Sequence, residues 1–438
     1  MYIYIKHAAL YLLRYQIGRM DYLIRTTPAS MCEAALVQFD AGIRCSYQAI
    51  VARVLTESQW EHACLPTRDG GLGLRSVRGS ADAAYYSSRA ATWERCEAIY
   101  SGYASLMDDP VRQVESNVNS KLGEHHHIPA LPSDAHIPSQ QSISRWLSAA
   151  LAQSLKDRAD PFQRVCQIAH SAPMCGRWLA APPSKTLDMH MSGAELTVTS
   201  SLHLGVDVLK GNELCKFCGE VLDAKGIHPV SCMSGGDVLL RHNRVRNIIF
   251  RYACRGQLNA ELEKAGILNE EGVFVDLSRP ADVMVDGLGS ASRSVERLAL
   301  DIKVINSLGV GHYADTLEGP LVAAGKYRDA ASARDNVRAK CAEKGVRYEP
   351  LVFTAQGGCE KHAEAIISQI ADNVAQAECR DKGKVKAEML ETISMSIARS
   401  VAKAVIRRQP KRPQAPSNSA SSTFLFESAI LEEPIEDD

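Results

Sequence analysis

A short stretch near the middle of the chain constrains its folding more than any other. Cys215, Cys218, His228 and Cys232 follow the spacing C-x2-C-x9-H-x3-C. Two thiolates two residues apart can bind one metal across a tight turn, and a His/Cys pair three residues apart can complete a tetrahedron from one helical turn. The alternative is a chance clustering in a chain with 13 cysteines. The spacing predicts a structural Zn²⁺ knuckle over residues 211–236, because four protein ligands leave no open position for catalysis.

Length and charge set wider limits. The 438 residues suffice for two or three domains. The charge is balanced, with 50 Lys and Arg against 51 Asp and Glu, so any surface for nucleic acid must be local. The first twenty residues lack a secretory pattern, and no uncharged apolar stretch approaches the roughly 20 residues that a membrane span needs. We expect a soluble intracellular protein, neither secreted nor membrane-bound, whose cysteines are free or metal-bound.

The N-terminal half is predicted to be helical. Apolar residues recur three and four apart between Ala8 and Leu23, and the stretch from Met31 to Trp60 contains no proline. We assign residues 1–103 to one helical segment, interrupted by a glycine-rich turn around Gly70. Residues 104–140 are rich in Ser, Pro and His and are predicted to form a linker. Residues 141–210 are predicted to be a helical connector.

An α/β pattern follows over residues 237–376. An amphipathic helix comes first, and short apolar runs at Ala281–Val285, Leu298–Ile305 and Pro350–Thr354 are predicted strands. Residues 377–408 are expected to form a C-terminal helix. The tail, 409–438, cannot bury enough apolar surface to fold and is expected to be disordered. The fold class is therefore α+β and multidomain, with a helical N-terminal half, the knuckle and an α/β core with a mixed central sheet.

One predicted strand carries an acid and a base. Asp301 and Lys303 lie two residues apart in an otherwise apolar run and emerge on the same face of a strand. Such charges are costly on a buried strand unless they are paired or bind something. Asp282 begins the preceding strand, and Glu263 could supply a third carboxylate. The alternative is an Asp301–Lys303 salt bridge with Asp282 capping a turn.

These residues match the needs of phosphodiester cleavage. Carboxylate oxygens suit Mg²⁺ or Mn²⁺, which activates a water and stabilises charge on the phosphate. Glu263, Asp282 and Asp301 are the candidate metal ligands, and Lys303 would orient the water or offset the charge. All four residues are predicted to be catalytic.

Basic residues near this constellation are candidates for nucleic-acid contact. The alternative for each is a solvated helix face. The candidates are Arg241, His242, Arg244, Arg251 and Lys340.

Several segments together resemble a known family. Arg-Pro-Ala-Asp, ending at Asp282, and Ala-Leu-Asp-Ile-Lys, ending at Lys303, resemble the PD-(D/E)XK nuclease pattern. The nearest resemblance is to the restriction-like endonuclease at the C-terminus of non-LTR retrotransposon polyproteins, in which a Cys/Cys/His/Cys knuckle precedes an Arg-His-Asn-type helix, here residues 241–243. The segment 65–75, Leu-Pro through Gly-Gly-Leu-Gly-Leu-Arg, resembles the end of a reverse transcriptase, and residues 1–103 resemble its thumb.

The resemblance implies a divalent-metal-dependent DNA endonuclease that nicks its target, with nuclear localisation or, failing that, a cytoplasmic one. The sequence lacks the polymerase palm and its Tyr-x-Asp-Asp box, so we expect no reverse transcriptase activity. It resembles the truncated 3′ portion of an element, whose priming step would need a full-length reverse transcriptase in trans. Two alternatives stay open: an inactive remnant that binds DNA or RNA through its knuckle and basic helices, and a helical interaction protein.

Overall fold

The computed structural model describes residues 5–133, 135–268, 280–288 and 297–409. Contacts group the chain up to Arg408 into one unit and the remainder into another. Arg279 and, apart from Gln409, the predicted disordered tail lie outside the described residues. The domain boundaries predicted within the first unit stay predictions. In the part of the chain that is described, no helix has the length and apolar character needed to cross a bilayer.

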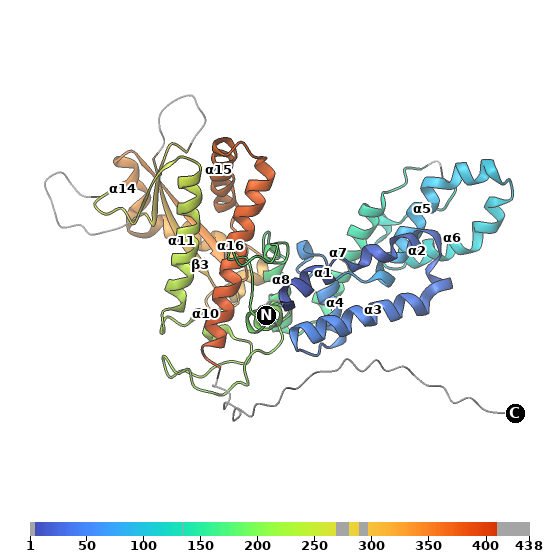
Figure 1. Cartoon of the computed structure of the whole chain (residues 1–438), viewed down its shortest axis with the longest axis horizontal. Helices are drawn as coiled ribbons and strands as arrows, with labels where there is room; N and C mark the ends of the chain where they lie inside the picture. The colour runs from blue at the N-terminus through green and yellow to red at the C-terminus, as the bar shows by residue number, and fades with distance from the viewer. Residues whose placement is uncertain (1–4, 134, 269–279, 289–296, 410–438) are drawn as a thin grey trace. The chain divides into compact units, whose positions relative to one another are not determined.

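Helices make up the N-terminal half, as predicted (Figure 1). Two of their starts are fixed by reciprocal capping: the Thr56 side chain accepts from the Gln59 amide and the Gln59 side chain from the Thr56 amide, and Ser192 and Glu195 do the same. The helices are α1 (Ile5–Leu13), α2 (Asp21–Thr26), α3 (Ala29–Val51), α4 (Glu57–Cys64), α5 (Val77–Ile99), α6 (Tyr103–Asn119), α7 (Gln140–Arg158), α8 (Pro161–His170) and α9 (Gly193–His203), with short 3-10 turns η2 (Gln16–Met20), η3 (Thr67–Asp69), η4 (Glu124–His126) and η5 (Arg177–Leu179).

The predicted linker is wrong over its first half, because helix α6 occupies it. Val111, Val114 and Val118 recur at helical spacing, are buried, and pack in one cluster with residues of α5 such as Tyr86. The polar composition of the segment and Pro110, which lies inside the helix, hid this periodicity. Packing against α5 therefore stabilises a helix whose local helical propensity is weak.

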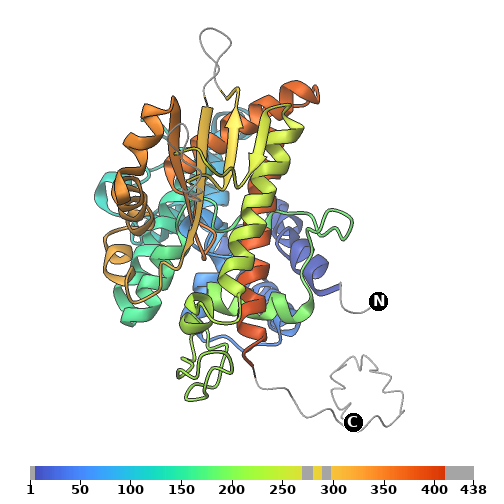
Figure 2. The same ribbon diagram turned by 90° about the vertical axis from the view of Figure 1, so that its left-hand side faces the viewer.

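A small mixed sheet forms the core of the C-terminal part (Figure 2). The order is β1-β2-β3-β4; β1 and β2 pair antiparallel, β2 and β3 pair antiparallel, and β3 and β4 run parallel. The mixed sheet is as predicted and contains the three predicted strands, whereas β1 was not foreseen. The strands are β1 (Asn259–Leu262), β2 (Val283–Asp286), β3 (Arg297–Ile305) and β4 (Val346–Thr354).

Helices lie on both faces of the sheet. Leu298, Leu300 and Ile302 of β3 pack into a large core with α11, α15 and α16, which contact one another (Figure 1). On the other face, Ala299 packs with Tyr348 and with Cys341 of α14. This alternation leaves Asp301 and Lys303 on the face of Ala299. The helices of this part are α10 (Ile227–Ser231), α11 (Asp237–Arg255), α12 (Tyr313–Glu318), α13 (Val322–Ala333), α14 (Val337–Glu343), α15 (Lys361–Ala377) and α16 (Lys382–Ile406), with the 3-10 turn η6 (Arg334–Asn336).

Candidate functional site

The predicted knuckle residues come together. Ligand atoms of Cys215, Cys218, His228 and Cys232 all lie within 4.8 Å of one another, so the group could hold a metal ion. Cys218 Sγ lies 3.3 Å from His228 Nε2 and 3.6 Å from Cys232 Sγ. Metal–sulfur bonds of about 2.3 Å in a tetrahedron place ligand atoms about 3.5–3.8 Å apart. The spacing of the side chains thus fits a small tetrahedral ion.

Short-range hydrogen bonds build this arrangement from the local sequence. The amide of Cys215 donates to the Glu220 carbonyl (2.7 Å) and that of Gly219 to the Cys215 carbonyl (2.8 Å), which closes the turn between the first two cysteines. Gly219 adopts φ +80°, a left-handed conformation that favours glycine. The Asp223 carboxylate accepts from the amides of Ile227 and His228 (2.8 and 2.7 Å) and so begins α10.

Electrostatics favour the thiolate form of Cys215 in the knuckle. Burial raises the pKa of Cys215, but the backbone amides of Phe217 and Cys218 outweigh it and lower that pKa to about 6. Metal ligation requires the deprotonated form of the thiol. The turn therefore prepares one of the four ligands before any ion binds.

A buried ion pair lies beside the knuckle. Arg408 has a fully buried side chain and donates to the Asp237 carboxylate (2.7 Å) and to the Ser234 carbonyl (2.9 Å). Arg407 also pairs with Asp237 (2.6 Å), and both guanidinium groups lie over the ring of Phe217. These contacts tie the knuckle to the beginning of α11 and the end of α16.

The candidate catalytic residues of β2 and β3 lie close together. The Oδ2 atom of Asp282 accepts a hydrogen bond (2.7 Å) from the amide of Ile302, which stands between Asp301 and Lys303. Lys303 Nζ donates to Asp301 Oδ1 (2.6 Å). The antiparallel register, continued by one residue beyond β2, sets Asp282 opposite Asp301. Two carboxylates and one ammonium group thus meet at the end of β2.

Two further side chains complete this arrangement. His242 Nε2 donates to Asp282 Oδ1 (3.1 Å) from helix α11, and Tyr348 Oη donates to Asp301 Oδ2 (2.7 Å) from β4. Tyr348 was not foreseen, because its contact with Asp301 depends on the β3–β4 register. His242 was expected to contact nucleic acid, and the structure places it against a candidate ligand instead.

The partners shift the pKa values of the two carboxyl groups in opposite directions. Burial raises the pKa of Asp282, but His242 and the Ile302 amide outweigh it and hold the pKa below its usual value. Burial also raises the pKa of Asp301; Lys303 and Tyr348 oppose this only in part, and the Asp282 carboxylate adds to it. The two acids therefore interact electrostatically, as a pair of neighbouring carboxylates does.

Glu263 does not join these groups. Its amide donates to the Asp282 carbonyl (3.0 Å), but its side chain forms an ion pair with Arg246 of α11. Within the described residues, the knuckle alone brings three or more Cys, His, Asp or Glu ligand atoms together. In this structure the sheet site therefore brings together two carboxylates, those of Asp282 and Asp301, and not three.

The predicted basic contacts differ in exposure. Arg241 is 2% exposed and donates to the Val230 carbonyl (3.1 Å), so the prediction that it contacts nucleic acid is wrong. It precedes the buried Val245 by one helical turn, and this spacing was the signal of its burial. Arg244 is exposed and donates to Ser400 Oγ (3.1 Å). Arg251 and Lys340 are exposed, as nucleic-acid contact requires.

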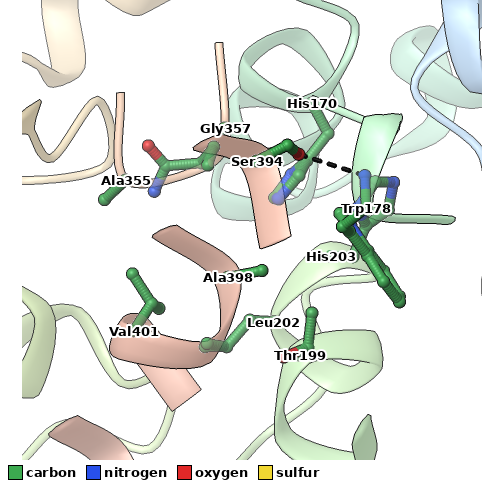
Figure 3. A pocket seen from close by; sticks show the side chains of 11 residues that line it. His170, Trp178, Thr199, Leu202, His203, Ala355, Gly357, Ser394, Ala398 and Val401 are labelled. Carbon is green, nitrogen blue, oxygen red and sulfur yellow. Dashed lines mark hydrogen bonds between the residues drawn. The ribbon is translucent and has the colours of Figure 1, made fainter. Parts of the chain in front are cut away.

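A buried histidine cluster lies elsewhere in the molecule (Figure 3). It consists of His62, His170 and His203. The rings of His170 and His203 lie 4.2 Å apart and are tilted by 41°, and His62 and Trp178 each lie 6.4 Å from His203. The backbone amide of Trp178 donates to Ser394 Oγ of α16 (3.1 Å). The adjoining cavity of about 30 Å³ is far too small for an organic substrate. The cluster therefore contributes to packing in the core and does not form a substrate site.

Comparison with protein-family models and with curated proteins gave no match. The fold and the sites define an α+β protein with a small mixed sheet and a Cys₃His group that could hold a metal ion.

Proposed function

We propose that the protein is a divalent-metal-dependent DNA endonuclease of the PD-(D/E)XK type, related to the C-terminal part of non-LTR retrotransposon polyproteins. One observation carries the proposal: the Asp282 carboxylate is hydrogen-bonded to the amide between Asp301 and Lys303. Two strands thereby deliver two acids and one lysine to one point, which is the set that metal-assisted phosphodiester hydrolysis needs.

We assign the following roles in phosphodiester hydrolysis to the residues of the sheet site. Asp282 and Asp301 hold a Mg²⁺ or Mn²⁺ ion through lone pairs that their present hydrogen bonds leave free. When bound, the ion supplies an activated water and neutralises charge on the phosphate. Lys303, which is linked to Asp301, offsets negative charge on the phosphate or orients the attacking water. Glu263 would act by turning away from Arg246 toward the ion.

The knuckle has a structural role in this proposal. Its four side chains would hold Zn²⁺ without an open position, and the Asp237–Arg408 pair would link the bound knuckle to α11 and α16. Arg251 and Lys340 would contact the DNA backbone. The DNA would be nuclear, and any reverse transcription would require a polymerase acting in trans.

A second candidate function is nucleic-acid binding without cleavage. The observation that favours it is the pairing of Glu263 with Arg246, which leaves two acids at the sheet site. A site with two ligands holds a divalent cation less tightly than one with three.

Nicking of supercoiled plasmid DNA in Mg²⁺ or Mn²⁺ tests the proposal. Asp301→Asn and Asp282→Asn should lose the activity. Asp286→Asn is the matched control, because Asp286 lies in β2 and pairs with Arg297 near the other end of the same strands. Equal nicking by Asp301→Asn and wild type would reject the assignment, whereas DNA binding by a wild type that never nicks would establish the second candidate.

A further inference from the structure

Three arginines line a recess in the helical N-terminal part, and none of its lining residues belongs to the sheet. The recess has a volume of about 400 Å³, and its basic lining residues are Arg14, Arg68 and Arg75. The hydroxyl-bearing residues Tyr15 and Thr67 also line it, and no Asp or Glu is among the described lining residues. The recess is thus a concave surface of one charge sign.

Arg14, which directly follows α1, lines the recess with a guanidinium group that two backbone carbonyls hold in place. Its Nε donates to the Leu72 carbonyl (2.9 Å), and Nη1 donates to the Leu179 carbonyl. Both acceptors are neutral, so they orient the guanidinium without cancelling its charge. Gly73, at φ +72°, permits this approach, because an added Cβ would lie 3.0 Å from Arg14 Nη2.

The neighbouring arginines add positive charge to the recess, which Asp69 offsets in part at Arg68. Arg14 and Arg75 line the same recess. Burial lowers the pKa of Arg14; Tyr15 opposes this effect, and the positive charge of Arg75 lowers the pKa further. Arg75 is exposed and has no hydrogen bond or ion pair among the described residues. Arg68 donates to Ser148 Oγ (3.2 Å) and has its acidic neighbour Asp69 at 3.6 Å. Like charges gathered in this way repel one another unless an anion binds between them.

We propose that this recess binds a phosphate group. Guanidinium groups match phosphate oxygens through paired N–H donors, and hydroxyl groups supply further donors. The chemistry is shared by a nucleic-acid backbone and by free phosphate. This site is independent of the proposed nuclease site, since it needs neither a divalent metal nor the sheet carboxylates.

The test measures binding of fluorescently labelled single-stranded and duplex oligonucleotides, DNA and RNA, by the full, zinc-loaded chain in a buffer without added Mg²⁺ or Mn²⁺. The variants are Arg75→Gln and Arg75→Glu. Arg95→Glu is the matched control, because Arg95 is exposed on α5 and has no partner among the described residues. Thermal melts verify that each variant folds.

We expect Arg75→Glu to weaken oligonucleotide binding about tenfold and to reduce the slope of log K against log salt by about 1, with Arg95→Glu unchanged. A second outcome would also support the site: inorganic phosphate at constant ionic strength stabilises wild type but not Arg75→Glu, and no oligonucleotide binds. The ligand would then be free phosphate. Equal effects of Arg75→Glu and Arg95→Glu in both assays would overturn the proposal.

Discussion

The knuckle and the buried histidine cluster both contain histidines, but the ring nitrogens of these histidines have different partners. In the knuckle, the imidazole of His228 and three sulfur atoms converge within 4.8 Å. In the buried histidine cluster, the ring nitrogens face backbone carbonyls: His62 Nε2 and His203 Nε2 both contact the Gly70 oxygen (2.9 and 2.8 Å). His170 Nδ1 likewise lies 2.9 Å from the Cys166 carbonyl.

The difference shows what a metal site requires beyond suitable residue types. A nitrogen that donates to a carbonyl carries a proton there and cannot ligate a metal through the same atom. In the knuckle, backbone amides bond to the thiolate of Cys215 and prepare it for a cation. In the buried cluster, the Gly70 carbonyl holds the neutral imidazoles of His62 and His203 and so fixes helices α4 and α9 to the glycine-rich turn.

The largest expected effect is the acid sensitivity of the buried cluster. Burial lowers the pKa of both His62 and His170 from 6.5 to about 4. Between pH 6.5 and about pH 4, these histidines are protonated in the unfolded chain but stay neutral in the folded state. The free energy of unfolding therefore falls over this range, by about 3 kcal/mol for each histidine. Urea unfolding of metal-free protein between pH 7.5 and 4 measures this loss.

The control for this prediction replaces the titrating groups. A His62→Gln, His170→Gln double variant should be less stable at neutral pH and should lose less further stability in acid, with the remaining loss coming from His7 and His203, whose pKa values burial also lowers. An unchanged acid dependence in that variant would show that other groups control it.

The second effect is metal removal from the knuckle. At free zinc about 1000-fold above Kd, the bound ion contributes about 4 kcal/mol to folding stability. Cys232→Ser should abolish binding of one zinc per chain and lower the midpoint of thermal unfolding. Native mass spectrometry and calorimetry measure both effects. Cys254→Ser is the control, because Cys254 is exposed and outside the group; equal metal content in both variants would contradict the assignment.

The two groups also differ in how far the sequence predicts them. The knuckle ligands lie within one short segment, so spacing alone predicts their convergence. His62, His170 and His203 belong to three separate helices, and only the tertiary packing brings them to one turn. The pattern of the sequence therefore carries no signal for the buried cluster.

The sheet site lies between these extremes. The apolar runs predict β2, β3 and β4, and alternation predicts that Asp301 and Lys303 share a face. The positions of Asp282 and Tyr348 beside them depend on strand register, which a single sequence does not reveal. Strand β1 escaped prediction because Asn259–Leu262 is short, polar and mostly exposed.

The third prediction tests whether the knuckle depends on its surroundings as well as on metal. Asp237 is 5% exposed and holds the buried guanidinium of Arg408. Asp237→Asn would leave that charge without a carboxylate and should cost about 3 kcal/mol in urea unfolding of the zinc-loaded protein. Glu57→Gln breaks an exposed pair with Arg44 and should cost less than about 1 kcal/mol. Similar costs for both variants would show that the knuckle is anchored by other contacts.

The smallest expected effect concerns the sheet site, where carboxylate oxygens are the candidate metal ligands. Tyr348→Phe removes one hydrogen bond to Asp301, which should cost about 1 kcal/mol of stability. It should also raise the pKa of Asp301 further above its usual value, because this hydrogen bond opposes the effect of burial. Carboxyl chemical shifts of Asp301, followed by NMR as pH is lowered, measure that change. Tyr313→Phe is the control, since its hydroxyl donates to the Pro161 carbonyl and not to a carboxylate. If the Asp301 pKa were the same in both variants, the carboxylate would be held by Lys303 alone, and the sheet site would resemble the simple salt bridge that the Asp-x-Lys pattern also allows.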